Sequence, residues 1–186
     1  MKAPLLTSLA IASCLVFSAA GCGGGGGNGD NFYGAAKVSV TAKPTRIDTG
    51  DRTQVKMELS EIHENGIAVK IRFPSGLVYV PGSSFLEVGP KEIDVDPKII
   101  TSDSSQEVSY VVIFLSQDQF RRSSDPYQGE SGTLRIELVG RKAVFDGEIE
   151  VDPDVNDLAV DDAVEFDVKN PNFVAEGSAS IQVVSQ

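Results

Sequence analysis

The sequence predicts an all-β protein built as a single antiparallel β-sandwich of about eight to ten strands. From Val38 onward, apolar residues recur at every second position, which is the period of a strand with one face on a core. Clusters of glycine, proline and asparagine separate these runs at short intervals, as turns do in all-β domains. No stretch shows a long amphipathic helical pattern, which argues against strands alternating with helices around a parallel sheet.

In the first half of the domain, the apolar runs end at turn signals such as Pro44, Pro74-Ser75-Gly76 and Pro81-Gly82. Asp94 and Pro97 interrupt the last of these runs, so we expect an edge strand with a bulge there. The expected strands cover residues 38–40, 55–59, 67–73, 77–80, 85–88 and 93–100.

In the second half, Val108–Leu115 carries apolar side chains on both faces, so we expect it to be the most buried central strand. Residues 117–131 form a long polar loop, which in a compact domain is either functional or mobile. An acidic loop precedes residue 164, and Asn170-Pro171-Asn172 forms a turn before the last strand. The remaining expected strands cover residues 134–138, 145–151, 164–168 and 179–183.

The N-terminus has the layout of a secretory signal peptide. Lys2 precedes an apolar run from Leu5 to Phe17, which is too short to remain as a bilayer anchor. Small residues then lead into a cysteine, in the order Ala19-Ala20-Gly21-Cys22. This pattern resembles the lipobox of bacterial lipoproteins, with Ala19 in place of the commoner leucine. The resemblance implies that the signal is cut before Cys22 and that Cys22 is lipidated.

The alternative is an ordinary signal peptidase site near Ala20, which would leave Cys22 as a free thiol. On the lipoprotein interpretation, the chain divides into a signal peptide (1–21), a lipidated cysteine with a glycine-rich tether (22–36) and the sandwich domain (37–186). The tether would hold the domain roughly 20 Å from the bilayer. The residue after the cysteine is Gly23 and not aspartate. In this respect the chain resembles lipoproteins that are sorted to the outer membrane. We therefore expect a lipid-anchored protein of the bacterial cell envelope, in the outer membrane.

Composition narrows the class of protein further. Removal of the signal leaves 165 residues, enough for one domain with a sizeable core. The other cysteine, Cys14, lies in the signal, so the exported chain has no disulfide and must be stabilised by packing or by a metal. With Lys2 removed, 15 basic residues face 27 acidic ones. Such a charge repels nucleic acid and anionic lipid head groups, and it favours cations or basic partners.

Three short motifs suggest a relationship to known modules. They are Val38-Ser39-Val40 leading to Pro44, Thr49-Gly50-Asp51 before the next strand, and the run from Phe73 to Val80. Together they resemble the immunoglobulin-like modules of bacterial surface proteins. The run from Phe73 is similar to one in the conserved-repeat surface domain, and the opening is similar to that of cohesin modules. The resemblance covers about half of the domain and implies an immunoglobulin-like sandwich without implying a ligand.

The acidic loop offers a candidate calcium site. A hard cation takes six to eight oxygen ligands, and alternate positions of a turning backbone can supply them. The candidate ligands are Asp152, Asp154, Asn156, Asp157 and Asp161. The pattern departs from the helix-loop-helix calcium loop, since Asp157 stands where the turn glycine is expected. A solvated acidic loop is the alternative.

The long polar loop offers candidate partner-binding residues, Arg121, Arg122 and Tyr127, which could contact an anionic or aromatic partner. The alternative is a solvated loop with local ion pairs. The exported chain has one histidine, His63, and no cysteine other than Cys22. These are too few side chains for a nucleophilic triad or a histidine-based zinc site. We therefore expect no enzymatic activity.

These observations lead to one hypothesis with an alternative. The leading hypothesis is a membrane-anchored lipoprotein that acts as a non-enzymatic interaction or structural module at the envelope, with another envelope or surface protein as its partner and no nucleic acid. The alternative is a calcium-stabilised or carbohydrate-binding module of a surface assembly.

Overall fold

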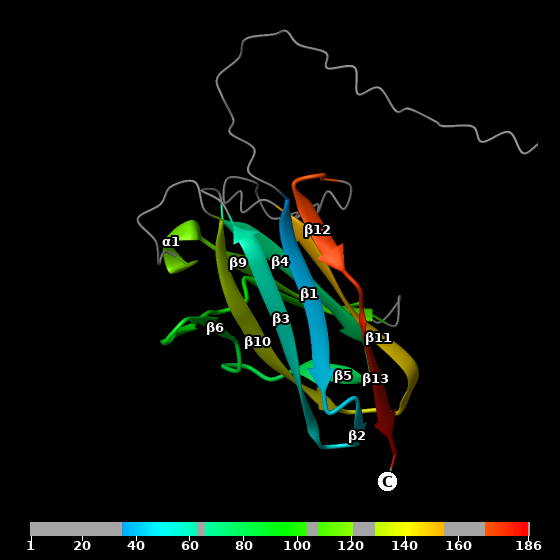
Figure 1. Ribbon diagram of the computed structural model, residues 1–186. Coiled ribbons are helices and arrows are strands. Elements are labelled where there is room, and N and C mark those ends of the chain that lie inside the picture. The colour runs from blue at the N-terminus through cyan, green and yellow to red at the C-terminus, as the bar shows by residue number, and fades with distance from the viewer. Residues whose placement is uncertain (1–34, 63–65, 104–107, 121–128, 155–169, 186) are drawn as a thin grey trace, which may run out of the picture. The chain divides into compact units, whose positions relative to one another are not determined.

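The computed structural model describes residues 35–62, 66–103, 108–120, 129–154 and 170–185. These residues form thirteen strands and one short helix, and the strands make two sheets packed face to face (Figure 1). The all-β sandwich predicted from the alternating apolar residues is confirmed. All of these elements belong to one compact unit, Phe32–Gln186.

The first sheet has the strand order β12-β1-β3-β10-β6-β7, and β5 also pairs with β10. Its strands are β1 (Ala36–Lys43), β3 (Arg52–Ile62), β5 (Leu77–Tyr79), β6 (Phe85–Val88), β7 (Lys91–Asp94), β10 (Glu130–Gly140) and β12 (Phe173–Glu176).

The second sheet has the strand order β2-β13-β11-β4-β9-β8. Its strands are β2 (Arg46–Asp48), β4 (Ile67–Pro74), β8 (Ile99–Asp103), β9 (Val108–Leu115), β11 (Val144–Asp154) and β13 (Ala179–Val184). The helix α1 (Gln117–Phe120) follows β9 and inserts Phe120 into the core, within a segment that the sequence predicts as loop.

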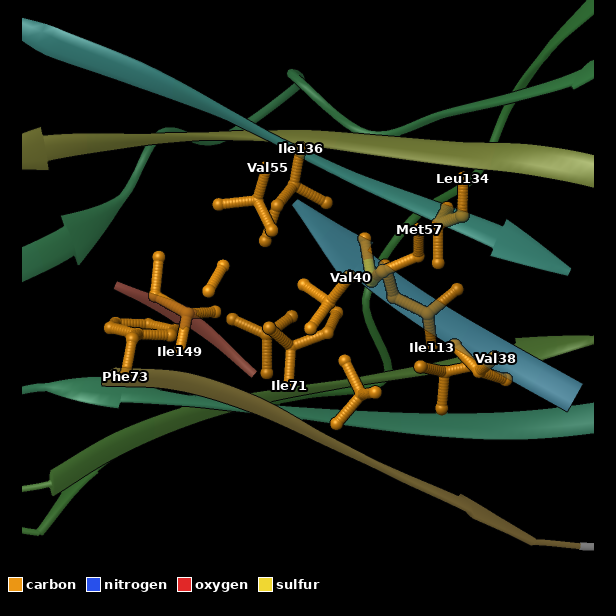
Figure 2. Close-up of a cluster of buried hydrophobic side chains, with 14 of the residues drawn as sticks. Val38, Val40, Val55, Met57, Ile71, Phe73, Ile113, Leu134, Ile136 and Ile149 are labelled. Carbon is orange, nitrogen blue, oxygen red and sulfur yellow. The ribbon is translucent and has the colours of Figure 1, made fainter. Parts of the chain in front are cut away.

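The core lies between the two sheets and is made of the inward-facing half of each alternating strand. Val55 and Met57 of β3 pair across to Ile136 and Leu134 of β10. Figure 2 shows these side chains meeting those of the opposite sheet, including Ile71. All five are fully buried. Each strand therefore contributes one apolar face, and the core needs both sheets to exclude water.

Two edge pairs are parallel, whereas the sequence pattern predicts an antiparallel sandwich. β12 pairs with β1 in parallel, with Phe173 opposite Ala36. β2 pairs in parallel with β13, with Ile47 opposite Val183. Both β2 and β12 are short strands that the alternation does not reveal, because three or four residues are too few to show a period.

The expected edge strand at 93–100 is two strands in different sheets. β7 ends at Asp94 in the first sheet, and β8 starts at Ile99 in the second. Pro97 lies in the connection, where its missing N–H removes no ladder hydrogen bond. The predicted interruption is therefore a crossing between sheets and not a bulge. The predicted strand at 164–168 lies outside the described residues.

Gly66, directly before β4, has a backbone conformation and a close neighbour that leave no room for a side chain. Its φ is +68°, and a Cβ there would lie 2.1 Å from the carbonyl oxygen of Leu115. Gly82 has a similar φ of +73°, but nothing lies within 4 Å of its Cβ position. Alanine substitutions at the two glycines therefore distinguish the free-energy cost of a left-handed backbone from the additional cost of a steric clash.

We expect Gly82→Ala to lower the free energy of unfolding by about 1–2 kcal/mol, the usual cost of a left-handed non-glycine residue. Gly66→Ala should cost at least about 2 kcal/mol more, because the β9 backbone would have to move. Urea denaturation of the two variants measures this difference. Equal losses would show that the contact with Leu115 does not constrain the fold.

Candidate functional site

The structure describes two of the residues predicted as functional, and both lie at the end of a strand. Asp152 and Asp154 belong to β11, on the face that points away from the core, instead of to a loop as predicted. The other predicted residues lie outside the described part of the chain, namely Cys22, Arg121, Arg122, Tyr127, Asn156, Asp157 and Asp161.

Asp152 is held by an arginine that the sequence analysis did not single out. Arg72 of β4 donates from Nε to one Asp152 carboxylate oxygen at 2.8 Å and from Nη2 to the other at 3.1 Å. Its Nη1 lies 3.0 Å from a carboxylate oxygen of Glu150. Hydrogen bonding to Asp152 raises the pKa of the Arg72 guanidinium, and partial burial offsets part of that rise. The sequence pattern shows that Arg72 faces outward from its strand. It does not identify Asp152 as the partner, because the two residues are 80 positions apart.

Asp154 is buried at the end of β11. It accepts a hydrogen bond from the side-chain amide of Asn170 at 3.1 Å. In the described part of the chain, no three histidine, cysteine, aspartate or glutamate side chains lie close enough together to hold a metal ion. A calcium ion at Asp152 would have to displace the Arg72 guanidinium from both carboxylate oxygens. Calcium binding by the acidic loop stays a prediction.

Apolar and aromatic side chains lie beside this charged pair on the outer face of the second sheet. Tyr110 of β9 stands opposite Arg72, and Phe114 lies four residues along the same strand. Lys70 places its ammonium 4.7 Å from the centre of the Tyr110 ring. Val112, between the two aromatics, is only 1% exposed although it faces outward. The strand expected to be the most buried central one lies between β4 and the edge strand β8, and β4 is as buried as β9.

We call this surface the aromatic-charged face. It comprises Lys70, Arg72, Tyr110, Phe114, Glu150 and Asp152. Its side chains come from three neighbouring strands, β11, β4 and β9, whose register brings them together. Because Arg72 and Lys70 are already held by their neighbours, the face is ordered before any partner arrives.

The outer face of the first sheet has a different character. A hollow of about 580 Å³ there is lined by small hydroxyl side chains, such as Ser39 and Thr133, and by carboxylates. The carboxylates are paired within the sheet, with Glu58 lying 3.2 Å from Lys56 and Glu87 lying 2.8 Å from Arg135. This face is polar and internally neutralised. Carbohydrate binding by the module, for which the sequence names no site, stays a prediction.

None of the helices in the part that the structure describes has the length and apolar character needed to cross a membrane.

Comparison with known proteins identifies no family. No family model matches the chain, and no curated protein matches its sequence. A non-cellulosomal cohesin from the hyperthermophilic archaeon Archaeoglobus fulgidus is 11% identical, with a TM-score of 0.44, over 81% of this chain and 93% of the cohesin.

Two larger proteins match over most of this chain. The type II cohesin dyad of the adaptor ScaA scaffoldin from Acetivibrio cellulolyticus is 11% identical, with a TM-score of 0.45, over 78% of this chain and 48% of the dyad. The major pilin SpaD from Corynebacterium diphtheriae is 13% identical, with a TM-score of 0.45, over 80% of this chain and 34% of the pilin. The chain thus spans half or less of these two proteins, and cohesins are among the modules that its sequence motifs resemble.

The Arg72–Asp152 pair should contribute measurably to stability. We expect a double-mutant cycle with Arg72→Ala and Asp152→Ala to give a coupling of about 1–2 kcal/mol, because the pair is bidentate and the Asp152 side chain is only 14% exposed. The matched control is Arg52–Glu137, a single contact whose arginine side chain is 61% exposed. Its coupling should be below about 0.5 kcal/mol. Urea denaturation measures both cycles, and equal couplings would contradict this interpretation.

Proposed function

We propose that the chain is a lipid-anchored, non-enzymatic interaction module of the bacterial cell envelope, tethered to the outer membrane through acylated Cys22. The sandwich carries the binding surface, and the glycine-rich segment after Cys22 provides its reach. The observation that carries the binding part of this proposal is the aromatic-charged face on the second sheet.

This face has the composition of a protein-binding surface. Tyrosine and arginine are over-represented at interface hot spots, where an aromatic anchor packs beside a group that is already oriented. Here Tyr110 and Phe114 supply apolar contact area next to the fixed guanidinium of Arg72. Since Lys70 and Arg72 keep their positions through existing contacts, binding would cost little additional side-chain entropy.

The charge around the face indicates the chemistry of the partner. Glu148 is exposed on the same side of β11 as Glu150 and Asp152, so the β11 border of the face is acidic. A protein that places an apolar side chain against Tyr110 and a lysine or arginine against Glu148 would complement it. The net charge of the chain favours the same basic partner and disfavours nucleic acid.

The anchor has a direct test. We expect mass spectrometry of the native protein to find an N-terminal acylated Cys22, and Cys22→Ser to move the protein out of the membrane fraction, because several acyl chains are needed for stable attachment. A mature N-terminus at Cys22 with a free thiol would contradict the anchor and leave the sandwich's binding role untouched.

The binding face can be tested separately. We expect a photo-crosslinking residue in place of Phe114 to trap a specific envelope protein, whereas the same residue in place of Val78 should not. Val78 is the matched control because it is an exposed apolar residue, 44% accessible, in β5 of the other sheet.

With that partner purified, Tyr110→Ala should weaken its affinity by about tenfold or more, the loss of a hot-spot side chain. Val78→Ala should leave the affinity unchanged. Titration calorimetry measures both, and equal crosslinking at residues 114 and 78 would overturn the assignment of this face.

A further inference from the structure

One end of the sandwich combines exposed basic residues with an exposed aromatic ring. β1 begins at Ala36 at one end and runs to Lys43 at the other, where β2 and the connection between β10 and β11 also lie (Figure 1). We call this second end the basic pole. It is formed by the exposed residues Lys43, Arg46, Arg141, Lys142 and Phe145.

Phe145 is the most exposed large hydrophobic side chain of the described residues, at 76% accessibility. The sequence pattern places it on a half-buried strand face, which is wrong. A register shift between Val144 and Gly147 leaves Phe145 and Asp146 without strand partners, and Asp146 has a φ of +52°. The bulge therefore turns the ring outward while Val144 and Gly147 stay buried.

The backbone around Phe145 is fixed by hydrogen bonds. The N–H groups of Arg141 and Lys142 both donate to the carbonyl oxygen of Gly76, at 2.7 and 3.1 Å. The N–H of Gly140 donates to the carbonyl oxygen of Asp51 at 3.0 Å, which joins this turn to the one before β3. The basic side chains thus project from a rigid turn beside the ring.

The basic residues of the pole differ from those on the sheet faces. On the sheet faces, Arg72, Arg135 and Lys56 each form an ion pair with a carboxylate. No ion pair links Lys43, Arg46, Arg141 or Lys142 to another described residue; Arg52, nearby, pairs with Glu137. Lys91 and Lys98, outside the pole, also form no ion pair with another described residue, so four of the six such cations lie at this end.

Three carboxylates oppose these cations. Asp48 and Asp51 line a hollow of about 450 Å³ with Arg46 and Arg52, so that hollow is not a favourable place for an anion. Asp146 is exposed next to Phe145. The turn that carries Arg141 and Lys142 adjoins the loop that lines the hollow through the hydrogen bonds of Gly140, and it combines both cations with the aromatic ring.

We propose that the basic pole contacts an anionic lipid bilayer, with Phe145 entering the head-group region and Arg141 and Lys142 binding lipid phosphates. An aromatic ring beside basic side chains is the combination that interfacial segments use. The acidic remainder of the domain does not prevent this contact, because screening reduces its repulsion beyond about 8 Å at physiological ionic strength.

The segment between Cys22 and the sandwich is long enough to allow this contact. This step rests on the proposed anchor at Cys22. The 14 residues from Cys22 to residue 35 can extend to about 48 Å, and β1 spans about 27 Å from one end of the sandwich to the other. A protein anchored at Cys22 can therefore bring its far end to the same bilayer. The tether raises the local concentration of the basic pole at the bilayer, so a low intrinsic affinity of the pole for lipid is sufficient.

The test uses the full, acylated protein in vesicles, with an environment-sensitive fluorophore on Phe145→Cys or, as the control, on Val174→Cys, an exposed apolar position at the opposite end of the sandwich. Acylation occupies the Cys22 thiol, so each variant carries one labelling site. On vesicles that contain phosphatidylglycerol, we expect a blue-shifted emission at residue 145 and a water-like emission at residue 174. Phosphatidylcholine vesicles, 0.5 M salt, or the double substitution Arg141→Glu and Lys142→Glu should each abolish the shift.

Water-like emission at residue 145 on anionic vesicles would overturn the proposal. So would a shift that survives the charge reversal, or one that appears only after an acidic envelope protein is added. Flotation of the protein with the vesicles is measured in the same samples. Loss of flotation reports failure of the anchor, whereas flotation without a shift reports failure of the basic pole.

Discussion

The packing of two apolar sheet faces against each other is the constraint on which the rest of this structure depends. The described domain contains no cysteine, so no disulfide holds the sheets together. The fully buried side chains of β3 and β10 from one side, and of β4 and β9 from the other, form one continuous core. Because the inward apolar positions of these strands are used for this core, the outward positions are left to define the chemistry of each surface.

The outward positions are used in two different ways. On the sheet faces, charges are neutralised locally, as between Arg72 and Asp152 or between Arg135 and Glu87. Such faces are ordered, and on the aromatic-charged face the exposed Glu148 leaves an acidic border that a basic partner would complement. At the basic pole, the cations have no such partners, and an attraction to anions remains. The overall negative charge of the chain conceals this difference, because net charge says nothing about how charges are distributed.

The bulge in β11 shows how a local departure from the strand pattern creates a surface. In a regular strand, Phe145 would lie opposite a residue of β13, and its face would be set by the alternation. One extra residue in β11, where Phe145 and Asp146 face the single Gln182 of β13, breaks that alternation, so the ring leaves the sheet beside the turn that carries Arg141 and Lys142. Val144 and Gly147 on either side remain in the core, so the departure does not open the sandwich.

The alternation of apolar residues was enough to predict the sandwich, most of its strands and the buried faces of residues such as Met57 and Ile71. That information is local, since the alternation within a single strand identifies which of its faces is buried. The partner of Arg72, the parallel edge strands and the exposure of Phe145 could not be predicted in this way. Each depends on the register between strands that are distant in the chain. Asp152 illustrates the limit, because its spacing pattern suggested a calcium ligand, while its contact with Arg72 exists only once β11 and β4 are side by side.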